Sequence, residues 1–96
     1  MTKTLPEVLN FYALNKQIPE GAAYIGRGRG SIWGNPFEIG KDGTREEVIA
    51  KYAVYAYINH ELMAKAREQL RGLNLVCFCA PKACHGDILL LIANNP

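Results

Sequence analysis

The sequence lacks the features of a membrane or secreted protein. No apolar run approaches the roughly 18 residues that a membrane-spanning helix needs, and the N-terminus lacks the apolar stretch of a signal peptide. The excess of positive charge is also small, with 11 basic and 9 acidic residues, which is too little to indicate nucleic-acid binding by itself. We therefore expect a cytoplasmic protein with no membrane partner.

The chain also lacks internal repeats, linkers and low-complexity segments. Its 96 residues fit a single domain, residues 1–96, and an apolar content of 49% is enough for a globular core. Its three cysteines cannot all pair within one chain. In a reducing cytosol, clustered cysteines are more often metal ligands, reactive thiols or core residues than disulfides.

Hydrophobic patterning predicts alternating strands and helices. The expected strands lie at 8–12, 22–26 and 75–79, and the expected helices at 44–58, 61–70 and 84–93. Thr44 and Glu47 have the spacing of a capping box at the start of the first helix. This order, with its apolar third strand, favours an α/β fold: a small Rossmann-like three-layer domain whose short, mainly parallel sheet is covered by helices.

A glycine-rich stretch, GRGRGSIWGNP, follows the second expected strand. Its glycines allow positive φ and a close approach to a ligand, and Arg27 and Arg29 could hold an anion through forked guanidinium donors. No Lys-Ser/Thr pair follows, so the stretch is not a Walker A loop. The alternative is a solvated surface loop. Asn35 either stabilises the turn or presents its side-chain amide to a ligand. Arg45 is either a surface charge or part of the same anion site.

The block CFCAPKACHGD contains all the cysteines and allows three interpretations. Cys77, Cys79, Cys84 and His85 match the ligand count of a tetrahedral zinc site, although the C-x-C-x4-C-H spacing is irregular. Alternatively, a cysteine at the strand-to-helix junction is a nucleophile or anion contact, with His85 as acid or base and Asp87 orienting it. In the third interpretation the cysteines are core residues, and Cys77 in mid-strand fits this best.

Several short blocks occur together in the order YIGR, GNPF, TREEVI, LRG, CFCAP and CHGD. In this combination, over about residues 7–94, the chain resembles the domain of unknown function 4326 family, small proteins of bacteria and phages. The resemblance implies a compact α/β domain with a pocket built from these blocks, but it transfers no activity. The positions that match the family are Arg27, Asn35, Arg45, Cys79, Cys84, His85 and Asp87.

We expect the Gly/Arg loop and the strand-to-helix junction to converge on one electropositive pocket. The expected ligand is a small anion, either a nucleotide or a phosphorylated metabolite. The expected ligand contacts are Gly26, Arg27, Gly28, Asn35, Arg45, Cys84 and Gly86. If the protein is a hydrolase or transferase, the expected catalytic residues are His85, Asp87 and Cys79.

Two other functions remain open from the sequence. The same pocket could bind its ligand without turnover and without a cofactor. Alternatively, zinc held by the cysteines and His85 would stabilise a module that binds nucleic acid or protein. A homodimer could complete the pocket of so small a chain in either case.

Overall fold

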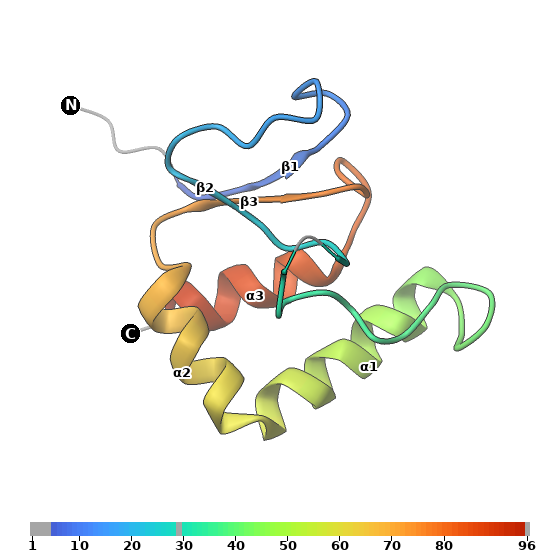
Figure 1. The fold of residues 1–96 in the computed structure, drawn as a ribbon. Helices are drawn as coiled ribbons and strands as arrows, with labels where there is room; N and C mark the ends of the chain where they lie inside the picture. Colours follow the sequence, from blue (N-terminus) through green and yellow to red (C-terminus); the bar gives the residue numbers. More distant parts are fainter. Residues whose placement is uncertain (1–4, 29, 96) are drawn as a thin grey trace.

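The fold consists of three short parallel strands and three helices over the residues described, 5–28 and 30–95, in a computed structural model (Figure 1). The elements, in chain order, are β1 (Val8–Asn10), β2 (Ala22–Tyr24), α1 (Arg45–Ile58), α2 (His60–Gln69), β3 (Asn74–Cys77) and α3 (His85–Asn94). The predicted α/β class and order of elements are therefore confirmed. None of these helices combines the length and apolar character that a membrane crossing requires.

The sheet has β3 at its centre, in the order β1-β3-β2, and both pairs of strands are parallel. Leu75 is aligned with Val8 on one side and with Ala23 on the other. The last three residues of β3 are buried, as the apolar sequence of this strand predicts. Because the strands are parallel, their carboxyl ends meet at one edge of the sheet, which is the usual ligand side of an α/β fold.

Each strand ends two residues before its predicted carboxyl end. At β1 the cause is Asn10, whose side-chain oxygen accepts hydrogen bonds from the backbone N–H groups of Tyr12 (2.8 Å) and Ala13 (3.1 Å) and turns the chain. The Asn10 amide nitrogen also donates to the carbonyls of Phe78 (3.3 Å) and Ala80 (2.8 Å). One asparagine therefore ends β1 and holds the bend after β3.

The helices lie on the same side of the sheet in Figure 1, with α3 next to it and α1 and α2 packed against α3. The expected Rossmann-like three-layer arrangement places helices on both faces of a sheet, and the described residues do not form it. The core between these layers includes Ile25, Tyr52, Leu75, Leu89 and Ile92, all at most 1% exposed.

The start of α1 confirms the predicted capping box. The Thr44 hydroxyl accepts from the Glu47 backbone N–H (3.3 Å), and the Glu47 carboxylate accepts from the Thr44 N–H (2.9 Å). The second helix begins at His60, because the Asn59 side chain caps it by accepting from the Leu62 N–H (3.1 Å). His60 is thus the first residue of α2.

Candidate functional site

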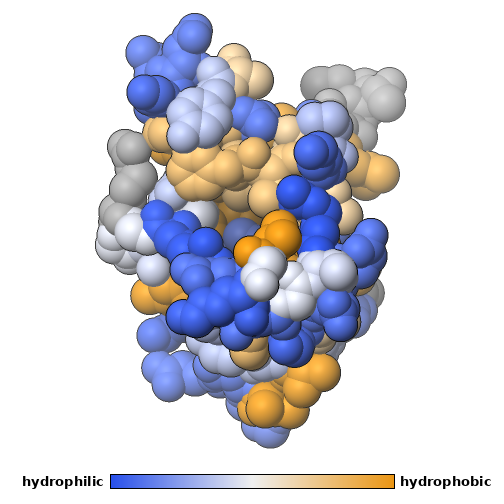
Figure 2. Space-filling model, turned by 90° about the vertical axis from the view of Figure 1, so that its right-hand side faces the viewer, coloured by the Kyte–Doolittle hydropathy of each residue, from blue (hydrophilic) through white to orange (hydrophobic). Residues whose placement is uncertain are grey.

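A pocket of about 430 Å³ opens at the edge of the sheet where the strands end. Its wall is formed by the residues that follow β2 and β3, by the GNPF turn, and by the first turns of α1 and α3. Figure 2 views the molecule from this side and shows a hollow with apolar surface beside it and hydrophilic side chains around it. The predicted site residues that line the pocket are Gly26, Arg27, Asn35, Arg45, Cys79, Cys84 and His85.

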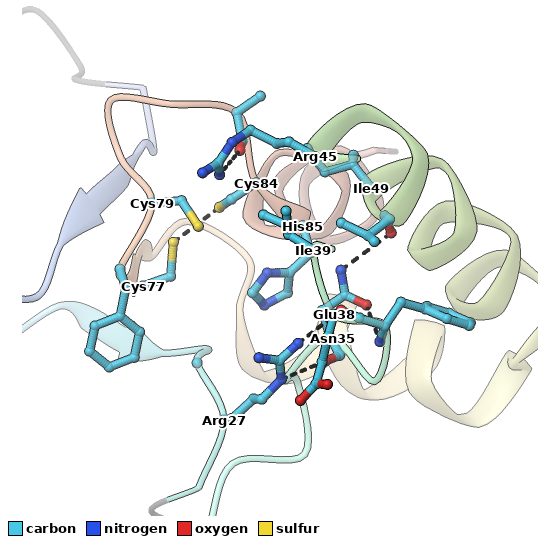
Figure 3. Close-up of a pocket in the computed structure, with 15 residues that line it drawn as sticks. Arg27, Asn35, Glu38, Ile39, Arg45, Ile49, Cys77, Cys79, Cys84 and His85 are labelled. Carbon is cyan, nitrogen blue, oxygen red and sulfur yellow. Dashed lines mark hydrogen bonds between the residues drawn. The ribbon is translucent and has the colours of Figure 1, made fainter. Parts of the chain in front are cut away.

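Arg27 connects the end of β2 to the GNPF turn. Its Nε donates to the Asn35 carbonyl (2.8 Å) and its Nη2 to the Phe37 carbonyl (2.8 Å). These two bonds use two of the five N–H donors of a guanidinium group. The arginine is therefore held by backbone groups while its charge stays on the pocket wall (Figure 3).

Asn35 is buried, with 9% of its surface exposed, and its amide is occupied by the protein. The side-chain oxygen accepts from the Phe37 N–H (2.9 Å), and the nitrogen donates to the Val48 carbonyl in α1 (3.3 Å). Of the two predicted roles for Asn35, these contacts favour the turn.

Arg45 occupies the first position of α1 and reaches across to the loop before α3. Its Nη1 donates to the Ala83 carbonyl (3.1 Å). In Figure 3, Arg45 and Arg27 lie at opposite ends of the pocket, with His85 between them. Glu38 also lines the pocket, so among the described residues the wall carries two arginines and one glutamate.

His85, the first residue of α3, is only 8% exposed. Its Nε2 lies 2.8 Å from the Ile25 carbonyl, and its ring packs edge-on against Tyr52 at 5.0 Å between centroids. Burial lowers the pKa of His85; the nearby Arg27 charge also lowers it, while the Ile25 hydrogen bond and Asp87 oppose the shift. The imidazole is therefore neutral near pH 7.

The Ile25 contact also fixes the tautomer of His85. A carbonyl oxygen can only accept, so Nε2 carries the proton and donates it, and Nδ1 keeps its lone pair. Within the described part of the chain, no group is hydrogen-bonded to Nδ1. A neutral imidazole with an available lone pair can accept a proton, which is the property of a general base.

Three predicted site residues, Asp87, Gly86 and Gly28, do not line the pocket. Asp87 accepts from the Cys84 backbone N–H (3.1 Å) and completes a capping box, and it is not hydrogen-bonded to His85 among the described residues. A Cβ added to Gly86 would lie 2.8 Å from Ile25 Cδ1 and 2.9 Å from Val8 Cγ2, so this glycine is needed for close packing of α3 on the sheet. Gly28 has positive φ and lies outside the lining, and Arg29 lies outside the described residues.

The cysteines form a closely spaced group on one side of the pocket. The Sγ atoms of Cys77 and Cys84 are 3.0 Å apart, and both residues are buried, while Cys79 is half-buried. The Cys84 sulfur also accepts from the Gly86 N–H (3.2 Å), so a cysteine serves as the N-cap of α3.

Hydrogen bonding between the two buried thiols separates their pKa values. The bond from Cys84 lowers the pKa of Cys77, and the same bond together with burial raises the pKa of Cys84. The lowered pKa makes Cys77, which the sequence had assigned to the core, a second candidate nucleophile beside Cys79, whose catalytic role stays a prediction. The alternation of strand residues places both on one face, and this was the available signal.

The zinc interpretation is not supported by the arrangement of its ligands. Among residues 5–28 and 30–95, no group of three or more His, Cys, Asp or Glu side chains is placed to hold a metal ion. The physical reason is the direction of His85, whose Nε2 bonds to Ile25. The proposed set of Cys77, Cys79, Cys84 and His85 thus divides into a thiol pair and a histidine that is bonded elsewhere, and zinc binding by the four residues stays a prediction.

The apolar part of the wall was not among the predicted site residues. Phe37, Ile39 and Phe78 line the pocket, together with Val48 and Ile49 of α1. Val48 and Ile49 fit the helical periodicity of a core-facing stripe, and that periodicity does not distinguish a core contact from a pocket wall. Phe78 is 42% exposed.

Comparison with known proteins identifies the family. A family model described as Domain of unknown function (DUF4326) matches residues 12–95. The chain belongs to this family. The blocks quoted from the sequence predicted this assignment.

A relative from Enterobacteria phage T4, described as an uncharacterized 12.4 kDa protein in the nrdA-td intergenic region, is 43% identical to the chain over 71 residues. The match covers 70% of this chain and 64% of the relative, so the chain spans less than two thirds of that protein. No solved structure matches the chain.

Proposed function

We propose that this DUF4326 domain binds a small anionic ligand, a nucleotide or a phosphorylated metabolite, in the pocket at the carboxyl edge of its sheet. The observation that supports the proposal best is the placement of Arg27 and Arg45 at the two ends of one pocket with the buried His85 between them. A volume of about 430 Å³ falls in the range of small-molecule sites, and apolar walls with a few polar groups are typical of them.

The two arginines are suited to an anion because each is already held in place. Arg27 donates to two backbone carbonyls and Arg45 to one, so their side chains lose little freedom when a ligand arrives. Their remaining N–H groups match the oxygen atoms of a phosphate group. The exposed part of Phe78 offers an aromatic surface for a planar ring at the same pocket.

His85 supports a hydrolase or transferase activity on such a ligand. Its neutral imidazole would accept a proton at Nδ1 from an attacking water or hydroxyl group, while the Ile25 carbonyl holds the ring in position. The same pocket without turnover would act as a binding protein. We also propose a cytoplasmic location, since the chain's cysteines are free.

Thermal unfolding in the presence of nucleoside mono-, di- and triphosphates and of inorganic phosphate tests the binding proposal. A bound ligand stabilises the folded state by about 2.7 kcal/mol at a concentration of 100 times Kd, and we expect such a rise in Tm for at least one nucleotide. No stabilisation by any of these anions would contradict the proposal.

An Arg45→Gln variant tests whether the anion is held as proposed. Loss of a charged hydrogen bond of about 1.5–3 kcal/mol should weaken binding by roughly 10- to 100-fold. Arg67→Gln is the matched control, because Arg67 is exposed on α2 and outside the pocket lining. Equal affinities of the two variants would show that the charge of the pocket wall is not used.

A His85→Gln variant separates the enzyme from the binding protein. If the protein turns over a bound nucleotide, this variant should keep binding and lose most of the turnover, by about 100-fold or more for a general base. If no bound nucleotide is consumed by the unaltered protein, binding alone is its function.

A further inference from the structure

We propose that Cys77 and Cys84 form a redox-active dithiol in the pocket wall, which peroxide converts reversibly into an intramolecular disulfide. The proposal rests on the geometry of the two thiols and does not depend on the ligand proposed above.

The fold brings the two cysteines together from different elements. Cys77 is the last residue of the central strand, and Cys84 is the N-cap of α3. Their sulfur atoms are 3.0 Å apart, and Figure 3 shows the two side chains directed at each other. A disulfide bond is about 2.05 Å long, so the atoms need to approach by only about 1 Å. The residues between them form a loop that can absorb so small a shift.

The environment of the pair also favours oxidation over inert packing. Both residues are buried, yet both line the pocket, which gives a small oxidant access. The hydrogen bond from Cys84 stabilises a thiolate on Cys77, and thiolates are the form that reacts with peroxide.

The chemistry is balanced with hydrogen peroxide as the oxidant. The Cys77 thiolate attacks one peroxide oxygen, the O–O bond breaks, and hydroxide leaves and is protonated to water, which gives a sulfenic acid. The Cys84 sulfur then attacks the Cys77 sulfur, loses its proton, and displaces the sulfenic hydroxyl as a second water. In sum, two thiols are oxidised to one disulfide and one peroxide is reduced to two waters. A dithiol reductant reverses the reaction by thiol–disulfide exchange.

Oxidation would change the start of α3. In the reduced state the Cys84 sulfur accepts the Gly86 N–H and contacts Cys77. The disulfide joins the end of β3 covalently to this helix. It also replaces the hydrogen bond between the Cys77 and Cys84 sulfur atoms. Cys79, which lies beside the contact in Figure 3, is outside the pair and serves as an internal control.

The test is alkylation of the full chain under denaturing conditions, before and after treatment with a small excess of hydrogen peroxide. We expect three alkylated thiols before oxidation, one afterwards, and three again after reduction with dithiothreitol. Three alkylated thiols after peroxide, or a sulfinic acid without a cross-link, would overturn the proposal.

Tryptic peptides identify the pair. Trypsin cuts after Arg71 and Lys82, so Cys84 falls on a different peptide from Cys77 and Cys79, and only a disulfide joins the two peptides. The cross-link should persist in Cys79→Ser, which leaves Cys77 as the sole partner of Cys84.

A Cys77→Ser variant should form the cross-link at least about tenfold more slowly. A cross-link that survives in Cys77→Ser and disappears in Cys79→Ser would assign the chemistry to Cys79 and overturn the proposal. If Cys77→Ser does not fold, the Cys79→Ser result on its own still decides between the two cysteines.

Discussion

Several polar side chains in and near the site are hydrogen-bonded to backbone groups of other segments. Arg27 holds the carbonyls of Asn35 and Phe37, and Asn10 holds the loop after β3. The Asn35 amide joins the GNPF turn to α1. Each of these bonds gives a backbone group near the pocket a side-chain partner. The shape of the pocket therefore depends on single residues.

An Asn35→Ala substitution tests this dependence. It leaves the Phe37 N–H and the Val48 carbonyl without these partners, and we expect it to lower the free energy of unfolding by about 1–3 kcal/mol. Urea unfolding measures the change. Asn95→Ala is the control, since Asn95 is exposed, and its effect should stay within about 0.5 kcal/mol.

His85 should make the stability of the protein depend on pH. Burial lowers its pKa in the folded state, so below the ordinary value of about 6.5 the unfolded chain binds more protons than the folded one. The contribution of His85 to the free energy of unfolding is fully present above about pH 6.5, and it declines as the pH falls towards the folded pKa. Titration of the imidazole by NMR in a His60→Gln variant, where His85 is the remaining histidine, measures the shift. An imidazole that titrates at or above 6.5 would contradict it.

At the scale of elements, the starts of two helices border the pocket and both carry capping boxes. Thr44 caps α1 and Cys84 caps α3, with Glu47 and Asp87 as the reciprocal acceptors. The residue after each cap, Arg45 or His85, lines the pocket. The two caps therefore set the positions from which the Arg45 and His85 side chains reach the pocket.

A Thr44→Ala substitution removes the hydroxyl that accepts the Glu47 N–H. We expect a loss of about 1 kcal/mol in the free energy of unfolding, because the first turn of α1 keeps an unsatisfied donor. Thr44→Ser retains the hydroxyl and should lose much less. Chemical denaturation followed by circular dichroism compares the two variants, and equal losses would show that the cap does not stabilise α1.

At the scale of the whole molecule, β3 organises the fold. It is the central strand, and its neighbours bond to it on both sides, through Leu75 N–H to the Glu7 carbonyl (2.9 Å) and Ile25 N–H to the Val76 carbonyl (2.9 Å). Its carboxyl end supplies Cys77 to the pocket. The central strand of the sheet thus adjoins the candidate site.

Hydrogen exchange should reflect this arrangement. The amides of Leu75 and Ile25 are buried in the sheet and should exchange only through global unfolding. The Lys82 amide, which bonds to the Cys79 carbonyl on an exposed loop, should exchange much faster. Exchange measured by NMR compares them directly. Similar rates for Leu75 and Lys82 would mean that the sheet opens locally and that β3 is not the stable centre.

The order of the elements, the α1 capping box and the family could all be predicted from the sequence. These depend on hydrophobic period, on short spacings such as Thr44 to Glu47, and on blocks such as GNPF, all of which are local along the chain. The strand ends were predicted two residues too far. At β1 the cause is the turn that the Asn10 side chain forms with Tyr12 and Ala13, and after β3 the same side chain holds the bend from 68–70 residues away.

The side chains that meet at the pocket, and the contacts that each makes there, became visible only in the folded chain. His85 bonds to Ile25, 60 residues earlier, and not to Asp87, which lies two residues along the same helix and caps its start. Cys77 and Cys84 become a pair because a strand end and a helix start face each other. Such contacts depend on how β2, β3 and α3 pack, and packing between distant segments leaves no period or spacing in the sequence.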